Sequence, residues 1–241
     1  METGLTEDAL LGGRLRLLQR RRGYRVAIDA VLLAAAVRPA SGERVLDLGA
    51  GIGSVGLCLA KRTPGCTVVG VELQPALAQL AERNAARNGL ADRVRTIVHD
   101  LAHPLPPALS QFDHVVTNPP YLSAAVADPS PDPSKALATV ESSADLARWL
   151  EVAATALKSA GTLTLIHRSD RLEEIATHLV RLGCGHLTIK RLPPVARVLV
   201  RARRGAARAV KESQPLVLHR PEGGYTEAAE AILRHAAALD F

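Results

Sequence analysis

Aromatic side chains are scarce in this chain of 241 residues, where tryptophan, tyrosine and phenylalanine together make up 2%. Cysteine is scarce as well, and Cys58, Cys66 and Cys184 are odd in number and widely separated. They fit neither a disulfide framework nor the Cys-x-x-Cys spacing of a zinc site, so we expect small apolar residues and no metal. Because aromatic residues are so few, an aromatic residue in a candidate site is stronger evidence for a functional role.

Long apolar runs are also missing. No run reaches eighteen apolar residues, so we expect no membrane-spanning helix. The opening residues METGLTEDALLGG lack the order of basic, apolar and small residues in a secretory signal, which predicts a cytoplasmic protein. The hydrophobic content of 47% still suffices for a buried core. The formal net charge of +6 suggests a polyanionic partner, although arginine-rich genomes also produce basic proteins.

Apolar runs of strand length alternate with segments of helical periodicity, which predicts an α/β fold with a largely parallel sheet. Strands are expected over residues 45–48, 67–71, 94–98, 112–117 and 162–166. Helices are expected over residues 26–37, 54–62, 75–88, 144–157, 172–182 and 225–239. Three later strands, near 186–191, 195–203 and 215–219, break the alternation. They would add antiparallel strands at one edge of the sheet.

The segment before the first core strand reads as a hairpin followed by one helix, which should pack over one end of the sheet. We therefore expect a single domain over residues 1–241, with an N-terminal extension over 1–43 and a core over 44–241. The longest irregular stretch lies at about 122–142, where prolines are spaced through the sequence. A loop of this length within a domain is usually functional or disordered.

The core is organised around Arg44–Gly56, which reads RVLDLGAGIGSVG. An apolar strand, a glycine turn and a helix form the first half of a nucleotide-binding βαβ unit. The G-x-G-x-G spacing differs from the G-x-G-x-x-G of dinucleotide sites, and Asp47 lies two residues before Gly49. A carboxylate beside the turn suits a cationic ligand better than a pyrophosphate. The segment resembles the first motif of the S-adenosylmethionine (AdoMet)-dependent methyltransferases.

Acidic residues accompany three successive strands: Asp47 within the first, Glu72 after the second and Asp100 after the third. The carboxyl ends of parallel strands share one crevice, so all three can face one ligand. Glu72 follows Asp47 by 25 residues, a fitting distance for one βαβ unit. Its carboxylate can accept both hydroxyls of an unphosphorylated ribose, and Asp100 can accept from an adenine amine.

The fourth strand runs directly into Asn118-Pro119-Pro120-Tyr121. Prolines have no N–H, so the carbonyls around them stay free to accept hydrogen bonds. The Asn118 side-chain oxygen and the Pro119 carbonyl can together hold a planar NH₂ group and aim its lone pair at a methyl group. Tyr121 offers a face on which a planar substrate can stack. The motif resembles the one shared by amino-directed methyltransferases, which implies methyl transfer to the exocyclic amine of adenine or to the side-chain amide of glutamine.

The chain as a whole resembles the bacterial tRNA(Val) adenine N6-methyltransferase family, and the resemblance covers most of its length. The matching segments are QRRRGYRVAIDAVLLAA, DLGAGIGSVGL, VELQPALAQLAERNAARNGL, NPPY, PPVARVLVRARRG and PLVLHRPEGGYTEAA. The resemblance implies a Rossmann-like class I methyltransferase that methylates the N6 amine of an adenine beside the anticodon of a tRNA. Basic residues are usual in this family after NPPY, whereas here Lys135 stands nearly alone.

The resemblance also implies residue roles. Asp47, Gly49, Gly51, Glu72 and Asp100 would bind AdoMet, and Tyr24, Arg25 and Asp29 would close the cofactor pocket. A plain surface charge is the alternative for Arg25. Asn118, Pro119 and Tyr121 would hold the target base, and Asn118 would adjoin the cofactor as well.

Arginine is concentrated after residue 196. The cluster comprises Arg197, Arg201, Arg203, Arg204, Arg208 and Lys211. Phosphates of an RNA are its natural partner, and a solvated strand edge is the alternative. For the protein as a whole, three alternatives stay open: a protein glutamine N5-methyltransferase, a non-catalytic RNA-binding protein that keeps the fold, and an NAD oxidoreductase. The glutamine enzymes share NPPY but usually carry a helical domain ahead of the core.

Overall fold

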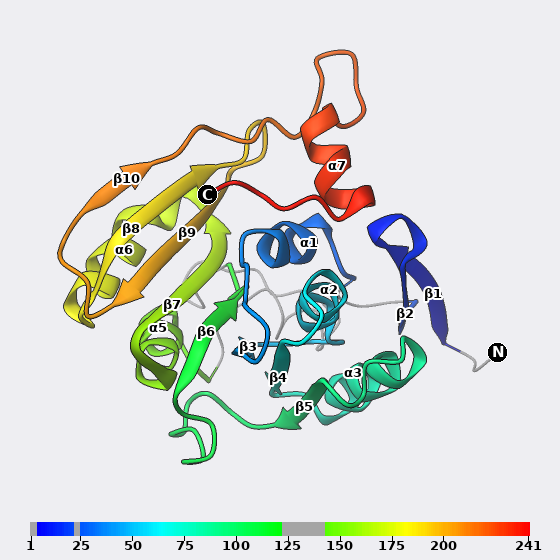
Figure 1. The fold of residues 1–241 in the computed structure, drawn as a ribbon, viewed down its shortest axis with the longest axis horizontal. Helices are drawn as coiled ribbons and strands as arrows, with labels where there is room; N and C mark the ends of the chain where they lie inside the picture. Colours follow the sequence, from blue (N-terminus) through cyan, green and yellow to red (C-terminus); the bar gives the residue numbers. More distant parts are fainter. Residues whose placement is uncertain (1–3, 22–24, 122–142) are drawn as a thin grey trace.

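An eight-stranded sheet forms the centre of the computed structural model, which describes residues 4–21, 25–121 and 143–241 (Figure 1). Across the sheet the strands follow the order β10-β8-β9-β7-β6-β3-β4-β5. They are β3 (Arg44–Leu48), β4 (Thr67–Glu72), β5 (Val94–Val98), β6 (Phe112–Thr117), β7 (Leu157–Arg168), β8 (Cys184–Arg191), β9 (Arg197–Arg204) and β10 (Val210–Glu212). Neighbouring strands pair in parallel except where β9 meets β7 and β8. The expected α/β fold with a mostly parallel sheet is confirmed.

The reversed strand lies at a different place from the one expected. β9 is enclosed between β7 and β8, whereas the edge strand on this side, β10, runs parallel to β8. The prediction of a strand over residues 215–219 is wrong: Leu216 and Leu218 donate to the carbonyls of Arg191 and Pro193, but the segment forms no strand ladder and only one isolated bridge, between His219 and Tyr225. Pro215 has no N–H to donate to a strand ladder, and the pairing is made by Val210–Glu212 instead.

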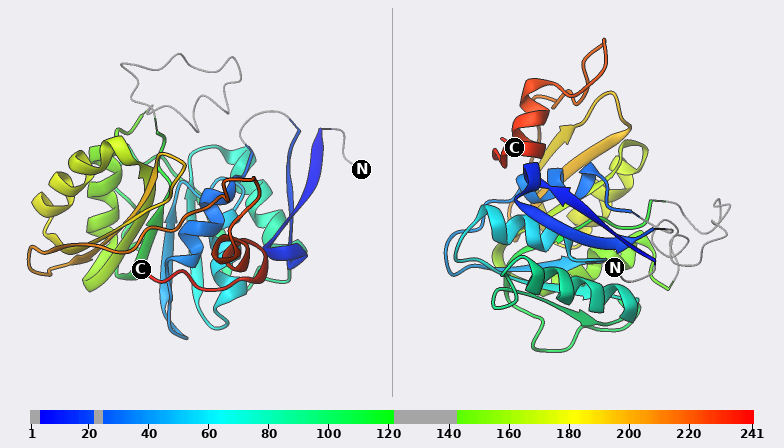
Figure 2. Two further views of the ribbon diagram at one scale, coloured as in Figure 1. Left: turned by 90° about the horizontal axis from the view of Figure 1, so that it is seen from above. Right: turned by 90° about the vertical axis from the view of Figure 1, so that its right-hand side faces the viewer.

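Helices cover both faces of the sheet (Figures 1 and 2). One face carries α1 (Ile28–Ala35), α2 (Ser54–Arg62), α3 (Pro75–Arg87) and α7 (Glu227–His235), and the other carries α5 (Leu146–Ala156) and α6 (Leu172–Arg181). Alternate residues of β3 supply the two cores, since Val45 packs with the first group of helices and Leu46 with the second. By the same alternation Asp47 points toward the α2 face, which decides its environment below.

The N-terminal segment is an antiparallel hairpin of β1 (Leu5–Leu10) and β2 (Leu15–Arg20) followed by α1, as expected. Asn84, a fully buried residue of α3, attaches the hairpin to the core. Its Oδ1 accepts from the Leu18 N–H at 2.8 Å, and its Nδ2 donates to the Leu18 carbonyl at 3.0 Å and the Ile52 carbonyl at 3.1 Å. One amide therefore ties the hairpin both to α3 and to the glycine turn.

The strand order places a crevice at the carboxyl end of β3. The chain continues from β3 to β4 and β5 on one side, and then returns to pair β6 on the other side of β3. Open α/β sheets bind ligands at such a reversal, because the connections diverge there and leave the strand ends uncovered. The glycine turn follows β3, Glu72 is the last residue of β4, and Asn118 follows β6.

Candidate functional site

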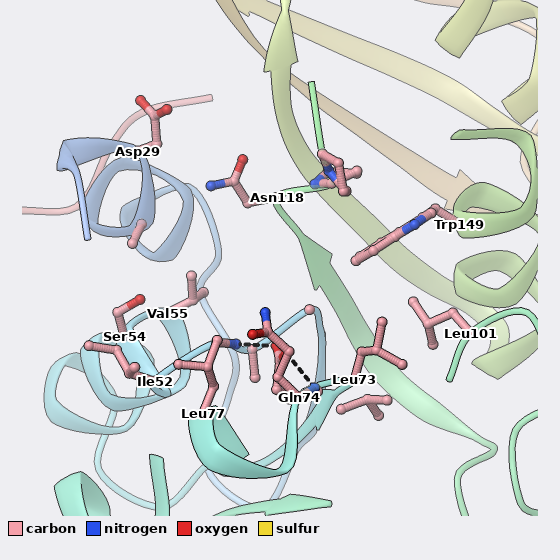
Figure 3. Close-up of a pocket in the computed structure, with 18 of the residues that line it drawn as sticks. Asp29, Ile52, Ser54, Val55, Leu73, Gln74, Leu77, Leu101, Asn118 and Trp149 are labelled. Carbon is pink, nitrogen blue, oxygen red and sulfur yellow. Dashed lines mark hydrogen bonds between the residues drawn. The ribbon is translucent and has the colours of Figure 1, made fainter. Parts of the chain in front are cut away.

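A pocket of about 500 Å³ opens at the carboxyl ends of β3, β4 and β6, a volume suited to a small-molecule ligand (Figure 3). Of the residues predicted from the sequence, those that line it are Arg25, Asp29, Gly49, Gly51, Glu72, Asp100, Asn118, Pro119, Tyr121 and Arg197. Asp47, Arg201, Arg203 and Arg204 do not line it. Tyr24 and the loop over 122–142 lie outside the described residues.

Two glycines of the turn have different reasons to be glycine. Gly51 has φ +57°, and an added Cβ would meet no atom of the described residues within 4 Å. Gly49 has φ +74°, and a Cβ there would lie 2.6 Å from the Trp149 side chain. A side chain at position 49 would therefore collide with the Trp149 ring of α5. Gly51 is the position that leaves the pocket open to a ligand.

Glu72 is fixed at the pocket by the backbone on both sides. Its Oε2 accepts the Gly51 N–H and its Oε1 accepts the Gln74 N–H, each at 2.9 Å (Figure 3). Burial raises the pKa of this carboxyl, and the two N–H donors oppose that rise. Each carboxylate oxygen keeps a further lone pair, so the pair of oxygens can also accept two hydroxyls from a bound diol.

Asp100 lies beyond β5, where it is more exposed than Glu72. Its Oδ1 accepts from the Ala102 N–H at 2.9 Å and from the Ser143 hydroxyl at 2.8 Å. These bonds, that from Ala102 first, hold the pKa of Asp100 below its ordinary value. The group is therefore a stable anion at neutral pH, and it can accept a hydrogen bond from an amine in the pocket.

Asp47 lies beneath the turn, outside the pocket wall. It is only 2% exposed, because its position in β3 directs the side chain toward α2. It accepts a hydrogen bond from the Gly56 N–H, and among the described residues its Oδ2 has no partner. Burial raises its pKa to about 7, and the nearby charge of Glu72 adds to the rise. A buried carboxylate with an unpaired oxygen is costly, so the site favours a proton or a neighbouring cation.

The NPPY segment places an amide and an aromatic ring together at the end of β6. The Tyr121 hydroxyl lies 2.6 Å from Asn118 Oδ1 and 2.8 Å from Asp29 Oδ2. The Arg197 guanidinium covers one face of the Tyr121 ring, with Cζ 4.2 Å from the centroid, and its Nε lies 3.4 Å from Asp29 Oδ2. Helix α1, β6 and β9 therefore meet at one aromatic ring.

His167, at the end of β7, was not predicted from the sequence. It is fully buried, it meets the Tyr121 ring edge-on at 5.2 Å, and its Nε2 lies 3.3 Å from the Pro120 carbonyl. Burial lowers its pKa to about 4, so at neutral pH the ring is neutral and can donate Nε2–H to that carbonyl. Its position directly after the apolar run expected over 162–166 was the available signal.

Trp149 was also missed, although it is the only tryptophan in the sequence. It projects from α5 into the pocket wall near Leu101 (Figure 3). The rarity of aromatic residues in this chain was the signal that could have identified it. A flat apolar ring at this position suits the face or edge of a nucleobase.

The arginines that cluster in the sequence are spread out in space. Arg197 begins β9 at the pocket, whereas Arg203 lies about 20 Å farther along the strand at 3.3 Å per residue. Arg203 Nε donates to the Ala160 carbonyl at 3.2 Å, and partly buried Arg204 donates to the carbonyls of Ala154 and Leu157. Arg201 stacks on Phe241, with Cζ 4.7 Å from the ring centroid. The four arginines on β9 lie on an enclosed strand, whereas Lys211 lies on the edge strand β10.

The sheet order, the glycine turn and the acidic residue at the end of β4 define the Rossmann-like class of methyltransferases. The model of the family "Methyltransferase small domain" matches residues 24–176. The chain belongs to this family.

Two curated proteins with the same name are similar in sequence to this chain. The chain is 33% identical over 213 residues to a tRNA1(Val) (adenine(37)-N6)-methyltransferase from Yersinia enterocolitica, a match covering 86% of this chain and 83% of the relative. It is 32% identical over 154 residues to a protein of the same name from Bacteroides thetaiotaomicron, which covers 64% of this chain and 63% of that relative. The match to the second relative thus spans less than two thirds of its length.

Solved structures agree on the fold. A predicted O-methyltransferase from Agrobacterium tumefaciens superposes with a TM-score of 0.71 at 24% identity, covering 88% of this chain and 98% of the other. A methyltransferase from Pyrococcus furiosus gives a TM-score of 0.60 at 18% identity, with coverage of 80% of this chain and 90% of the other.

Within residues 4–21, 25–121 and 143–241, no helix has the length and apolar character needed to cross a membrane.

Proposed function

We propose that this protein transfers a methyl group from AdoMet to the exocyclic N6 amine of an adenine in tRNA, at position 37 beside the anticodon. The observation that carries the proposal is the Asn118 amide beside the Tyr121 ring, in the same pocket as the buried Glu72. Figure 3 shows Asn118 and Asp29 on one side of this pocket and Gln74 and Leu77 on the other. The names of the relatives support the choice of tRNA and of position 37.

The residues present fit AdoMet. The Glu72 oxygens would accept the two ribose hydroxyls, and Asp100 would accept the adenine amine. The unpaired Oδ2 of buried Asp47 would supply negative charge behind the turn, which suits a ligand with an ammonium and a sulfonium. When bound, AdoMet supplies an electrophilic methyl group.

The amine must be oriented, because its lone pair is delocalised into the purine ring. Asn118 Oδ1 and the Pro119 carbonyl would each accept one of its hydrogens, which lets the nitrogen pyramidalise and directs the lone pair out of the ring plane. His167 holds the Asn118–Tyr121 segment in place by its hydrogen bond to the Pro120 carbonyl. The chemistry therefore rests on positioning, and it needs no side chain that acts as a strong base.

Tyr121 would offset the cost of turning the adenine out of its stack in RNA. The Arg197 guanidinium lies over one face of this ring, so it would lie beside a base that is held at Tyr121. Arg197 would then contact RNA at the pocket, and Arg203 would meet a phosphate farther along β9. Arg204 is instead held by the carbonyls of Ala154 and Leu157, and Arg201 by Phe241.

The test is methyl transfer from labelled AdoMet to two transcripts of one valine tRNA, with adenine or guanine at position 37. Only the adenine transcript should be labelled, and nucleoside analysis should give N6-methyladenosine. Asn118→Ala should lower turnover by at least about a hundredfold and leave AdoMet affinity nearly unchanged, because the amide acts on the reacting amine. Label on a protein glutamine and none on RNA would replace the proposal by the glutamine enzyme. AdoMet binding without transfer to either would favour the RNA-binding protein.

A further inference from the structure

We infer that Asp29 is a positioning residue for the reaction: it receives the hydroxyl hydrogen of Tyr121 and thereby keeps the Asn118 carbonyl available to the substrate amine. The inference rests on the proposed function of Asn118. Asp29 stands in the first turn of α1, 92 residues before Tyr121, and its side chain is only 14% exposed. Figure 3 shows it near Asn118 at the same side of the pocket.

The Tyr121 hydroxyl has fewer hydrogens than nearby acceptors. A tyrosine hydroxyl carries one hydrogen, but two acceptor oxygens lie close to it, Asp29 Oδ2 at 2.8 Å and Asn118 Oδ1 at 2.6 Å. Hydrogen bonds to a carboxylate are about twice as strong as those to a neutral amide. The hydrogen therefore goes to Asp29, which leaves the hydroxyl oxygen facing the Asn118 oxygen with no hydrogen between them.

Turning the Asn118 amide by 180° about its last bond removes this conflict. Its Nδ2 then donates one hydrogen to the Tyr121 hydroxyl, whose own hydrogen goes to Asp29, so that both short contacts join a donor to an acceptor. The same rotation exchanges the two ends of the amide and turns Oδ1 away from the hydroxyl, so that it is free for an amine. Asp29 thus decides which end of the Asn118 amide meets the substrate.

Arg197 holds the Asp29 carboxylate in place for this role. Its Nε lies 3.4 Å from Asp29 Oδ2, and its guanidinium rests on the Tyr121 ring. The Asp29 carboxylate is therefore held between the Arg197 cation and the Tyr121 hydroxyl, from which it accepts the hydrogen bond. Without Asp29 the hydroxyl hydrogen would turn to Asn118 Oδ1 and compete with the substrate for that acceptor.

This mechanism predicts a rescue. Asp29→Ala should lower kcat roughly ten- to a hundredfold, the range expected when a functional group is misoriented, with little change in AdoMet affinity. Adding Tyr121→Phe removes the competing hydrogen, so the double variant Asp29→Ala/Tyr121→Phe should turn over faster than Asp29→Ala alone. Asp92→Ala, at an exposed position away from the pocket, is the matched control and should behave as wild type.

The measurements are kcat on the adenine transcript and AdoMet affinity by calorimetry for all four proteins. A double variant no faster than Asp29→Ala overturns the inference, as does an Asp29→Ala protein with full turnover or with AdoMet affinity lost in parallel. Failure of the proposed function is a separate result, since it would show as wild-type protein inactive on the transcript. If wild type instead methylates a glutamine amide, the same four proteins are compared on that substrate.

Discussion

Replacing Asp47 by asparagine tests whether this buried carboxyl is protonated in the ligand-free protein. The side chain is 2% exposed, its Oδ2 has no partner among the described residues, and Glu72 stands nearby. Each of these features opposes a second charge at this point of the core, and together they raise the pKa of Asp47 to about 7. Asparagine has nearly the same shape and can still accept from the Gly56 N–H, but it never ionises.

The expected size follows from the difference in pKa between the folded and unfolded chain. The unfolded value is about 4, so between about pH 4 and pH 7 the native state binds one more proton than the unfolded state. The free energy of unfolding therefore falls as the pH rises through this interval. The fall is about 1.4 kcal/mol per pH unit, or about 4 kcal/mol in all. Between pH 5 and pH 8 about 3 kcal/mol of this should be seen.

Urea unfolding of wild type and Asp47→Asn at pH 5, 6, 7 and 8, without ligand, is the assay. The variant should gain about 3 kcal/mol relative to wild type from pH 5 to pH 8. His167, whose pKa is lowered, is present in both proteins and cancels in the difference. Glu72 is coupled to Asp47, so the difference includes the change that the substitution makes in the titration of Glu72. Asp92→Asn changes an exposed residue, and its free energy of unfolding should depend on pH in the same way as that of wild type. Equal pH dependence of wild type and Asp47→Asn would refute the reasoning.

Three further predictions concern the ligands. Glu72→Ala should weaken AdoMet binding by about 1.5–3 kcal/mol, the scale of hydrogen bonds to a charged group, and unchanged affinity in calorimetry would remove Glu72 from the ribose site. Trp149 is the only tryptophan and lines the pocket, so binding of AdoMet should quench the intrinsic fluorescence of wild type. A Trp149→Phe protein that still binds AdoMet should show no such quenching. Wild-type fluorescence that does not change at saturating AdoMet would place the ligand elsewhere. Arg203→Gln should lower the salt slope of RNA binding by about one unit, whereas Arg204→Gln should mainly destabilise the fold because Arg204 binds the carbonyls of Ala154 and Leu157; an unaltered slope for Arg203→Gln would exclude a phosphate contact.

Local sequence patterns determined most of the architecture. The apolar runs and helical periods located the core strands and their helices, because each element is selected by the spacing of residues within it. The glycine turn and NPPY could be placed at strand ends for the same reason. Since parallel strands end at one edge, their proximity followed from the α/β pattern alone. The misplaced strand over 215–219 shows the limit, because pairing at a sheet edge depends on the partner strand as well as on the segment itself.

Tertiary structure alone decided what each of these residues faces. Asp47 was expected at the ligand, but the pleat of β3 turns it toward α2 and buries it. Gly49 is approached by Trp149 from α5, and Asp29 reaches Tyr121 across 92 residues of sequence. The arginines that are neighbours in the sequence are separated because an extended strand advances about 3.3 Å per residue. Contacts of this kind depend on strand order and side-chain direction in the packed molecule, and no local spacing records them.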